Sequence, residues 1–493
     1  MILSVLGINA QYTYFSETFG EFGDQETESV TNVEVVGDSI YMFGGIESDI
    51  IPFSTLLRIV DIDGDLIDER IMPKDYNSFL IGHGNAVSKT SDNSFLFTQQ
   101  VSQDGGKGIA IRYNLSMDTL WEKTYDLYPS TSTYFRSNYS KNDVNLVLGE
   151  HNSLYSSFLI SLSEEGEVIW NKALRNGIDG SVGYNNEDLI FLEDGYLIGG
   201  FRRSDGDIAL LTKTDLEGNS EWEYYADNFL DIEGDMARTQ RYRLSELPNG
   251  EIIGAHMILY EYYGPTSPPN TPHWYRSIHL SKINVADTSL YWEHDFFTDH
   301  EFEVGTILWK ILGTEDNGVI MMGSTPILAE NAWVCKIDST GVIEWFNYYS
   351  LDISQTQETY DPRDIEQTSD GGFVVVGRYF SYTEDSHKKS WVLKIDACGD
   401  VEWQGCDYVG IQDSKKIKVD VYPNPTSEFV TIEGEDLTGK TRVMIYDQLG
   451  GVVLNQKLNR GNQLQVGQFH SGLYHLVLVE EGVIVYSEKI VVR

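Results

Sequence analysis

A phrase that recurs seven times along the chain of 493 residues limits the fold more than any other feature of the sequence. Its clearest copy begins at Ser369 and ends at Trp403. In order, this copy contains an Asp-Gly pair, an apolar run that ends in Gly, a variable stretch, a Lys-Ile-Asp strand whose Asp opens an Asp-x-x-Gly turn, and the Trp. The closing positions of the seven copies are 67, 121, 170, 222, 292, 345 and 403. They lie roughly 50 to 70 residues apart, which is the size of a unit of four short strands.

Each copy carries the turn and strand signals of a small antiparallel sheet. The Asp-Gly or Asn-Gly pair turns the chain where positive φ is needed, and the apolar run forms a strand that is buried on both faces. The Trp is expected to pack the last strand against its neighbour. We expect the seven units to close into a ring, because closure removes exposed sheet edges, and an open solenoid is the alternative. Residues 14–22 are similar to the strand that follows the Trp in other copies, so an N-terminal strand is expected to complete the last unit.

The composition agrees with an all-β chain. Aromatic residues make up 12%, and short runs rich in Val, Ile, Tyr and Phe are separated by Asp-Gly and Asn-Gly pairs. We therefore predict an all-β fold, in which a seven-bladed β-propeller is followed by a small C-terminal β-sandwich.

The charge of the chain is strongly acidic and unevenly distributed. The formal net charge is -41, with 35 Lys and Arg against 76 Asp and Glu. From Ser414 to the C-terminus the two signs balance, so the residues before Ser414 carry the whole excess. Such a field repels phosphate backbones, and we predict no binding of nucleic acid. A solvated surface for salty surroundings explains the excess, and a surface for a cationic partner is the alternative.

Residues 1–10 are expected to be a signal peptide. An apolar run from Ile2 to Ile8 is followed by Asn9 and Ala10, where a small residue suits signal peptidase. The run is too short to span a bilayer, and no later segment reaches that length, so we predict no transmembrane segment. A basic start is missing, so the true start is expected upstream; a frayed N-terminal strand is the alternative.

A different pattern follows the repeats, after the basic segment Lys415–Lys418. It combines an extended Tyr-Pro-Asn-Pro entry, alternating strands, Gly turns and a final strand with Lys. Its marker residues are Tyr422, Pro423, Asn424, Pro425, Gly450, Gly472, Tyr474 and Lys489. In this order the pattern resembles the type A sorting domain of type IX secretion substrates, and the repeats resemble propeller-like repeats of exported Bacteroidetes proteins. An ordinary adhesive β-sandwich is the alternative.

The resemblance implies an export route and a domain order. The signal peptide would take the chain across the inner membrane, and the type IX machinery would recognise the tag at the outer membrane and usually remove it. The protein is then expected to be secreted or held at the cell surface after it passes the periplasm. The expected domains are residues 1–10 (signal peptide), 11–410 (propeller), 411–420 (linker) and 421–493 (sorting domain).

The three cysteines are too few for a disulfide framework and lack the paired spacing of a zinc site. Cys398 and Cys406 are close enough to bridge in an oxidising compartment, so we predict a disulfide between them. Cys335 lies in an alternating run and is expected to be a buried free thiol.

One oxygen-rich run is a weak candidate for calcium. It contains Asp61, Asp63 and Asp65. The run departs from the EF-hand spacing and falls where every copy places its Asp-x-x-Gly turn, so a plain hairpin turn is the preferred interpretation. No other metal and no cofactor is predicted.

No motif in the sequence specifies catalysis. The signatures H-E-x-x-H, G-x-S-x-G, the P-loop and paired C-x-x-C are missing from the sequence. We favour a recognition or adhesion module for a glycan or a surface protein over an enzyme. A secreted polysaccharide hydrolase or lyase is the alternative, because a propeller can bring carboxylates from distant blades together. A purely structural surface component is a third hypothesis. An inward-facing cluster of acids, Arg or His at the channel mouth would favour the enzyme.

The segments that vary between copies are the expected ligand-binding loops. They lie between the Gly-ended strand and the Lys-Ile-Asp strand, at 46–56, 101–107, 150–156, 201–207, 255–278, 324–331 and 378–389. We expect them on one face of the ring, opposite the Asp-x-x-Gly turns. The candidate binding residues are Tyr260, Tyr262, Tyr263, His273, Trp274, Tyr275, Arg378, Tyr379 and Tyr382. The alternative is that these rings only pack each loop onto its own blade.

Overall fold

The structure of the chain is a computed structural model, and the residues it describes form strands and turns without a helix. The described residues are 15–19, 27–47, 54–73, 79–81, 85–101, 106–127, 133–151, 156–174, 183–203, 207–226, 237–262, 273–286, 288–296, 307–325, 331–349, 358–381, 385–401, 419–434, 441–446, 452–458, 463–469, 472–480 and 483–493. The chain divides into two compact units, one with Met1–Val334 and Tyr348–Gly405, the other with Cys335–Asn347 and Cys406–Arg493.

Seven antiparallel sheets are formed by the described residues between Phe15 and Ile395. Sheet 1 contains β2 (Thr27–Val36), β3 (Ser39–Glu47), β4 (Ser54–Asp61) and β5 (Leu66–Pro73). Sheet 2 contains β6 (Phe79–Ile81), β7 (Val87–Lys89), β8 (Phe95–Val101), β9 (Lys107–Tyr113) and β10 (Thr119–Tyr125). Sheet 3 contains β11 (Thr133–Lys141), β12 (Val144–His151), β13 (Ser156–Leu162) and β14 (Val168–Ala173). Sheet 4 contains β15 (Gly183–Leu192), β16 (Gly195–Arg203), β17 (Ile208–Thr214) and β18 (Ser220–Tyr225). Sheet 5 contains β19 (Ala237–Glu246), β20 (Ile252–Tyr262), β21 (His273–Ile283) and β22 (Leu290–Phe296). Sheet 6 contains β23 (Ile307–Gly313), β24 (Val319–Thr325), β25 (Asn331–Ile337) and β26 (Ile343–Tyr349). Sheet 7 contains β27 (Glu358–Gln367), β28 (Phe373–Ser381), β29 (Asp385–Ile395) and β1 (Phe15–Phe19).

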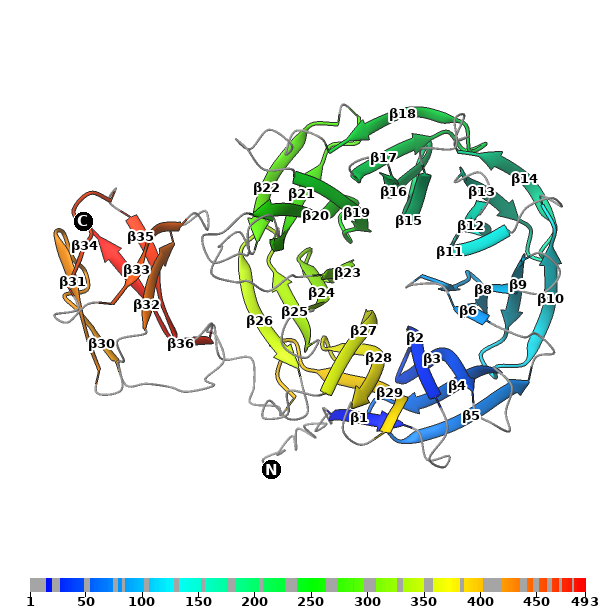
Figure 1. Ribbon diagram of the computed structural model, residues 1–493, viewed down its shortest axis with the longest axis horizontal. Helices are drawn as coiled ribbons and strands as arrows, with labels where there is room; N and C mark the ends of the chain where they lie inside the picture. Colours follow the sequence, from blue (N-terminus) through cyan, green and yellow to red (C-terminus); the bar gives the residue numbers. More distant parts are fainter. Residues whose placement is uncertain are drawn as a thin grey trace, which may run out of the picture. The chain divides into compact units, whose positions relative to one another are not determined.

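The sheets lie around a ring, as in a β-propeller (Figure 1). The first strand of each sheet, here called the inner strand, lies nearest the centre, and the fourth strand lies at the rim. Sheet 7 is completed by β1, which pairs antiparallel with β29 and sets Phe15 opposite Lys394. The Trp391 indole also donates a hydrogen bond of 3.0 Å to Ser16 Oγ. The prediction that an N-terminal strand completes the last unit is confirmed.

The charged residues of the repeated phrase bind each other inside the sheets. Lys394 Nζ lies 2.7 Å from Asp370 Oδ2, and both side chains are 0% exposed. Burial would raise the pKa of Asp370, but hydrogen bonds from Lys394 and Thr368 outweigh it and lower the pKa. Sheet 4 repeats the pair with Lys213 and Asp194, 3.1 Å apart. The Asp of the first turn and the Lys of the third strand therefore join three strands of one sheet.

The closing Trp and the Gly of the Asp-x-x-Gly turn pack together between neighbouring sheets. Gly166 has φ of +75°, and a Cβ atom there would lie 2.8 Å from the Trp121 ring of the preceding sheet. The Trp121 indole donates a hydrogen bond of 2.7 Å to the carbonyl of Glu164. Gly218 and Trp170 repeat this contact in the next pair of sheets. The Trp therefore packs against the neighbouring sheet, as predicted.

The Asp of each such turn accepts hydrogen bonds from its own turn. Asp61 Oδ1 accepts the N–H groups of Asp63 and Asp65 at 3.0 and 2.9 Å. Asp396 Oδ1 accepts those of Cys398 and Asp400 at 2.8 and 2.9 Å in sheet 7. The calcium candidate thus has the hydrogen bonds of an ordinary turn. In the described part of the chain, no group of three or more His, Cys, Asp and Glu residues is placed to hold a metal ion.

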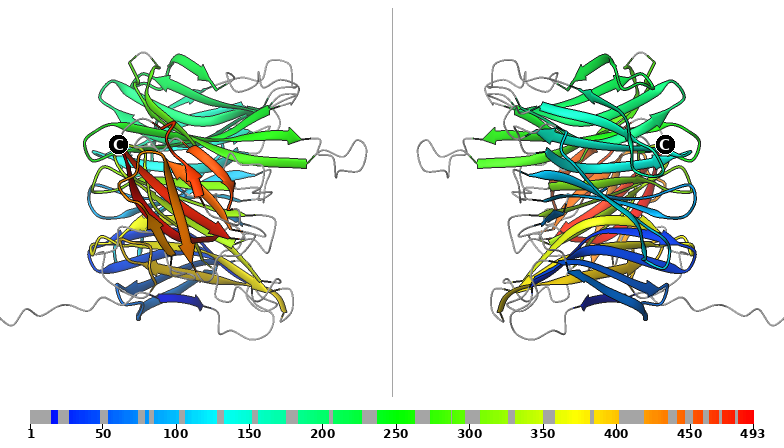
Figure 2. Two further views of the ribbon diagram at one scale, coloured as in Figure 1. Left: turned by 90° about the vertical axis from the view of Figure 1, so that its left-hand side faces the viewer. Right: turned by 90° about the vertical axis from the view of Figure 1, so that its right-hand side faces the viewer.

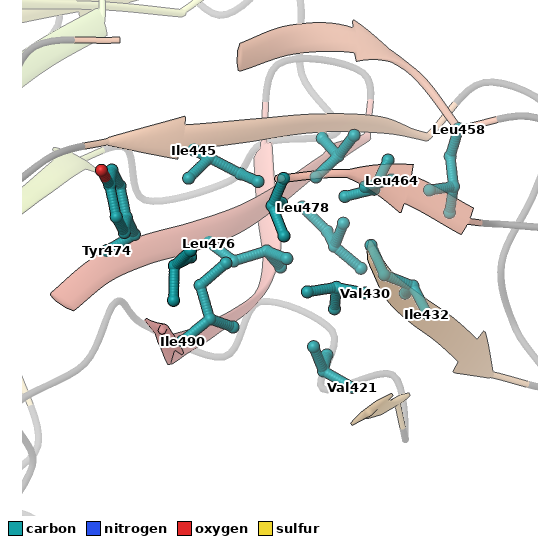
Figure 3. Packing of buried hydrophobic residues seen from close by; sticks show 13 residues of the cluster. Val421, Val430, Ile432, Ile445, Leu458, Leu464, Tyr474, Leu476, Leu478 and Ile490 are labelled. Carbon is teal, nitrogen blue, oxygen red and sulfur yellow. The ribbon is translucent and has the colours of Figure 1, made fainter. Parts of the chain in front are cut away.

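The C-terminal strands form two sheets around one hydrophobic cluster (Figure 3). The strands are β30 (Val419–Tyr422), β31 (Phe429–Gly434) and β34 (Gln463–Gln465) in one sheet, and β33 (Val452–Lys457), β32 (Arg442–Tyr446), β35 (Gly472–Glu480) and β36 (Val483–Val492) in the other. Val430 and Ile432 of the first sheet meet Ile445 and Leu476 of the second. Alternate residues of these strands, such as Leu476 and Leu478 of β35, face this cluster, whereas Val491 of β36 is exposed.

The structure changes one predicted domain boundary, that of the linker, and does not test the boundary of the signal peptide. The predicted linker 411–420 ends inside a strand, since β30 begins at Val419. The Val419 and Asp420 backbone pairs with β31, which fixes these residues in the sheet. The predicted signal peptide, residues 1–10, and the basic segment before Val419 lie outside the described residues.

Candidate functional site

The sheets of the ring have two different ends. Because neighbouring strands are antiparallel, the connections between first and second strands and between third and fourth strands lie at one end, which we call the turn end. The connections between second and third strands lie at the other end, which we call the variable end. The green pair β20–β21 extends beyond the other strands at this end (Figure 2). Variable segments and Asp-x-x-Gly turns therefore lie at opposite ends, as predicted.

The fifth predicted loop, 255–278, is for the most part a pair of strands. Strand β20 continues to Tyr262 and β21 starts at His273, with Tyr260 opposite Tyr275 and Trp274 opposite Glu261. The loop prediction was wrong here because runs of aromatic and β-branched residues extend a hairpin ladder. Tyr263 lies outside the described residues.

The seventh predicted loop, 378–389, is also shorter than expected. Arg378 and Tyr379 belong to β28, and Tyr379 pairs with Lys389 of β29. Tyr382 lies outside the described residues. The two hairpins place their predicted residues at the same end of the ring, in sheets 5 and 7.

At the turn end, polar side chains of the inner strands meet across the centre of the ring. Lys141 Nζ of sheet 3 lies 2.7 Å from Glu246 Oε2 of sheet 5, so this ion pair bypasses sheet 4. Asn85, next to sheet 2, donates a hydrogen bond of 2.5 Å to Asp188 of sheet 4. The protein's own side chains therefore occupy the centre at this end.

One lysine at the turn end is shared by acids of two sheets. Lys310 Nζ lies 2.5 Å from Asp364 Oδ1 and 3.1 Å from Glu366 Oε1. Burial, followed by the charge of Glu366, raises the pKa of the nearby Glu34 well above its ordinary value. Three carboxylates thus surround one ammonium group, and the centre is acidic here.

The inner strands contain a β-bulge near their middle. In six sheets, the first strand contains one extra residue in its register with the second strand. The residues in these shifts are Thr31, Arg136, Glu187, Arg241 with Tyr242, Trp309 and Arg363. A bulge changes the direction of a side chain and bends its strand, so residues that a regular ladder would point elsewhere can meet across sheets.

Three bulge residues from sheets 5, 6 and 7 come together. The guanidinium carbon of Arg241 lies 4.8 Å from the centre of the Trp309 ring, and that of Arg363 lies 4.6 Å from it. The Trp309 indole donates a hydrogen bond of 3.0 Å to Ser324 Oγ. The indole is thus fixed in place, and its ring attracts one arginine from each neighbouring sheet.

The predicted residue Arg378 lies beside this group. Its Nε donates a hydrogen bond of 3.0 Å to Asp361 Oδ2, the oxygen that also accepts from Arg363. Tyr379, the other described residue of the seventh predicted loop, packs its ring 5.1 Å from that of Tyr360.

Two further cationic side chains, Arg276 and Lys388, are repelled electrostatically by these arginines. Burial and the charge of Arg241 lower the pKa of Arg276. Burial, followed by Arg378 and Arg363, lowers the pKa of Lys388. Burial and the same kind of repulsion lower the pKa of Arg363. We call this set the arginine–tryptophan cluster, and its members are Arg241, Arg276, Trp309, Asp361, Arg363, Arg378 and Lys388.

The arginine–tryptophan cluster is cationic in a part of the chain that is otherwise acidic. Five of its side chains are cationic and one, Asp361, is anionic. Sequence reasoning identified only Arg378. A local signal was present in β19, which carries Arg238, Arg241 and Arg243 in one strand of a chain with net charge -41. The bulges that bring the residues together have no comparable signal in the sequence.

The cysteines agree in part with the predicted pattern. Cys335 is a buried free thiol, and burial raises its pKa. Cys398 is disulfide-bonded. Cys406 lies outside the described residues, so the bridge between Cys398 and Cys406 stays a prediction.

The sorting-motif residues divide into structural and exposed ones. Asn424 Nδ2 donates a hydrogen bond of 2.7 Å to the Lys489 carbonyl, and its Oδ1 accepts the N–H of Val491 at 3.0 Å. Tyr474 is buried in the hydrophobic cluster, and Gly472 begins β35. Gly450 lies outside the described residues. Tyr422, Pro423, Pro425 and Lys489 are exposed, and so is Asn424 in spite of its two hydrogen bonds.

Residues 420–493 match the family model of the secretion system C-terminal sorting domain. This confirms the resemblance of the last strands to a type IX tag. The tag directs export by the type IX system to the cell surface or the outside. In the part of the chain that the structure describes, no helix has the length and hydrophobicity to cross a membrane. No curated protein matches the sequence.

Several solved β-propeller structures are similar to the chain. A protein of unknown function from Dyadobacter fermentans has a TM-score of 0.44 and 10% identity, over 78% of this chain and 99% of that one. The β-propeller domain of the Trilobed protease from Pyrococcus furiosus has a TM-score of 0.41 and 9% identity, over 76% and 99%. The GH93 α-L-arabinofuranosidase of Fusarium graminearum, in complex with arabinobiose, has a TM-score of 0.41 and 12% identity, over 63% and 91%. At such identities, no activity carries over to this chain.

Proposed function

We propose that this exported protein is a recognition module that binds a glycan or a surface protein at the variable end of its ring. The observation that carries the proposal is the arginine–tryptophan cluster, in which three sheets bring cationic and aromatic groups together. We further infer that the seven sheets form a closed seven-bladed β-propeller, and that the two C-terminal sheets form a β-sandwich. The rigid scaffold would hold the binding groups in place, as in other loop-built sites.

The position of the cluster supports binding at this end. The turn end is crossed by the Lys141–Glu246 pair, whereas Arg378 at the variable end keeps 26% of its side chain exposed. The backbone of the predicted residues of β20 and β21 lies at the same end.

A polysaccharide hydrolase or lyase is the second candidate function. An inward-facing Arg cluster is the feature expected for that alternative, so the cluster supports it too. Its single carboxylate, Asp361, is already bonded to Arg363 and Arg378. Hydrolysis by two carboxylates therefore gains no support from this cluster. Lyase chemistry would need a base beside a substrate carboxylate.

A glycan and polysaccharide array with the full chain tests the proposal, and it should be read for both binding and cleavage. We expect retention of a defined set of glycans without release of products. Turnover of a retained polysaccharide would favour the second candidate. Failure to bind any glycan or surface protein would contradict recognition.

A further inference from the structure

We propose that the arginine–tryptophan cluster binds an acidic polysaccharide through the carboxylate groups of its sugar residues. This inference rests on the proposed recognition function and names the ligand class for the same site. The carboxylates would pair with guanidinium groups of sheets 5 and 7, next to Trp309 of sheet 6.

The charge of the cluster favours an anionic ligand. Among the residues that the structure describes, the cluster holds five cationic side chains and one carboxylate, although the part of the chain before Ser414 carries the whole excess of acidic residues. Arg363 and Arg378 already share that carboxylate, Asp361. A bound anion would relieve the mutual repulsion of these cations, and charge-assisted hydrogen bonds are among the strongest polar contacts.

The geometry favours carboxylates in particular. A guanidinium group is planar and donates two parallel hydrogen bonds to a carboxylate. Arg241 and Arg363 are both held against Trp309, at 4.8 and 4.6 Å from the ring centre. Contact with the ring restrains each guanidinium before the ligand arrives, so less side-chain entropy is lost on binding.

The aromatic neighbours favour a sugar chain over an acidic peptide. Trp309 lies beside both Arg241 and Arg363 and is partly exposed. A carboxylated sugar presents a charge and a flat apolar ring face in the same residue, which matches a site that combines guanidinium groups with an aromatic ring. An acidic peptide side chain offers only the charge.

Calorimetric titration of the full chain with polygalacturonate tests the inference. We expect the wild type to bind it, with affinity that falls as salt is added. Arg241→Gln should weaken binding at least about tenfold, because one guanidinium is lost. Arg241→Lys should restore only part of the affinity, because lysine lacks the planar group. Arg70→Gln, which changes an exposed arginine on the outer strand β5, is the matched control and should bind as the wild type.

Neutral dextran and poly-L-glutamate separate the remaining outcomes. Equal binding of polygalacturonate by the wild type and Arg241→Gln, with unchanged melting temperatures, would overturn the inference. Stronger binding of poly-L-glutamate would also overturn it and would indicate an acidic protein partner. Binding of neutral glycans alone would refute the acidic ligand but leave the proposed recognition function standing. Recognition itself fails only when the array and every probe are negative.

Discussion

Two lysines of β29 lie at opposite ends of sheet 7, and their surroundings are opposite. At the turn end, Lys394 is fully buried and paired with Asp370. At the variable end, Lys388 lies near Arg378 and Arg363, and burial together with these charges lowers its pKa. The same residue type in one strand is part of the repeated framework at one end and part of a cationic excess at the other.

The centre of the ring shows the same division. On the turn-end side of the bulges, Lys310 lies near the carboxylates of Asp364, Glu366 and Glu34, whereas arginines gather at the bulges and on their variable-end side. Burial of the Lys394–Asp370 pair serves packing, whereas the partly exposed Arg378 of the cluster can also reach a ligand. We therefore expect substitutions at the turn end to change stability and substitutions at the variable end to change binding.

The largest effect is expected for Lys394→Met at the turn end. The substitution leaves the Asp370 carboxylate buried without its partner, which should lower the free energy of unfolding by about 3–5 kcal/mol. Chemical unfolding of the full chain measures the change. The double variant Lys394→Met with Asp370→Asn should recover part of the loss, and a single variant as stable as the wild type would contradict the pairing.

A smaller loss is expected for Gly166→Ala, which breaks the contact between neighbouring sheets. The new Cβ would meet the Trp121 ring at 2.8 Å, and alanine is also disfavoured at φ of +75°. We expect a loss of about 2–4 kcal/mol from strain and overpacking together. Gly250→Ala is the matched control, since its φ is +81° and nothing lies within 4 Å of its Cβ. Equal melting temperatures for the two variants would refute the Trp contact.

A gain in stability is expected for Glu34→Gln, with a defined pH dependence. Burial and Glu366 raise the pKa of Glu34, so the folded state binds the proton more tightly than the unfolded state. The charged form therefore destabilises the fold above the raised pKa, and this penalty disappears as the pH falls towards 4.5. The variant should be about 1 kcal/mol more stable at neutral pH and lose that advantage in acid.

Melting temperatures measured at several pH values test this prediction. The exposed Glu217→Gln is the control, because it lies in a turn away from Lys310. A gain that stays constant across the pH range would show that the charge of Glu34 is not its cause.

The smallest effect is expected for Lys388→Met, the same substitution as the first and in the same strand. Removing a cation that its neighbours repel should change the free energy of unfolding by less than about 0.5 kcal/mol or raise it slightly. The two lysine variants can be compared in one unfolding experiment. If Lys388→Met lowered the free energy of unfolding as much as Lys394→Met, the expectation that only substitutions at the turn end change stability would be wrong.

The sequence predicted the repeated framework because its turns and strands are local signals. The Asp-Gly pair, the Gly-ended strand and the Trp lie within one copy, and each has a fixed role that recurs. The pairing of β1 with β29 was also predictable, because residues 14–22 match the fourth strand of other copies. The contact of Lys394 with Asp370 was not foreseen, since nothing in the spacing says which of the many acids a lysine faces.

The candidate site was harder to predict because it depends on bulges in three sheets. Arg241, Trp309 and Arg363 lie in the inner strands, outside the variable segments that were expected to bind a ligand. An extra residue in each strand brings them together, and a single sequence shows no marker for where that residue falls. The predicted aromatic loop failed for a related reason, since its ends continue the ladder of β20 and β21.

The pairing of β1 with β29 also sets the order in which the ring can be finished during synthesis. A chain made and exported from its N-terminus first carries β1 without its partner while sheets 1 to 6 form. The partner arrives only with Asp385–Ile395, shortly before the sorting tag at residues 420–493. A nascent chain that stops before Asp385 therefore lacks both β29, the partner of β1, and the sorting tag. A tag that reaches the outer membrane consequently belongs to a chain that already contains every strand of its ring.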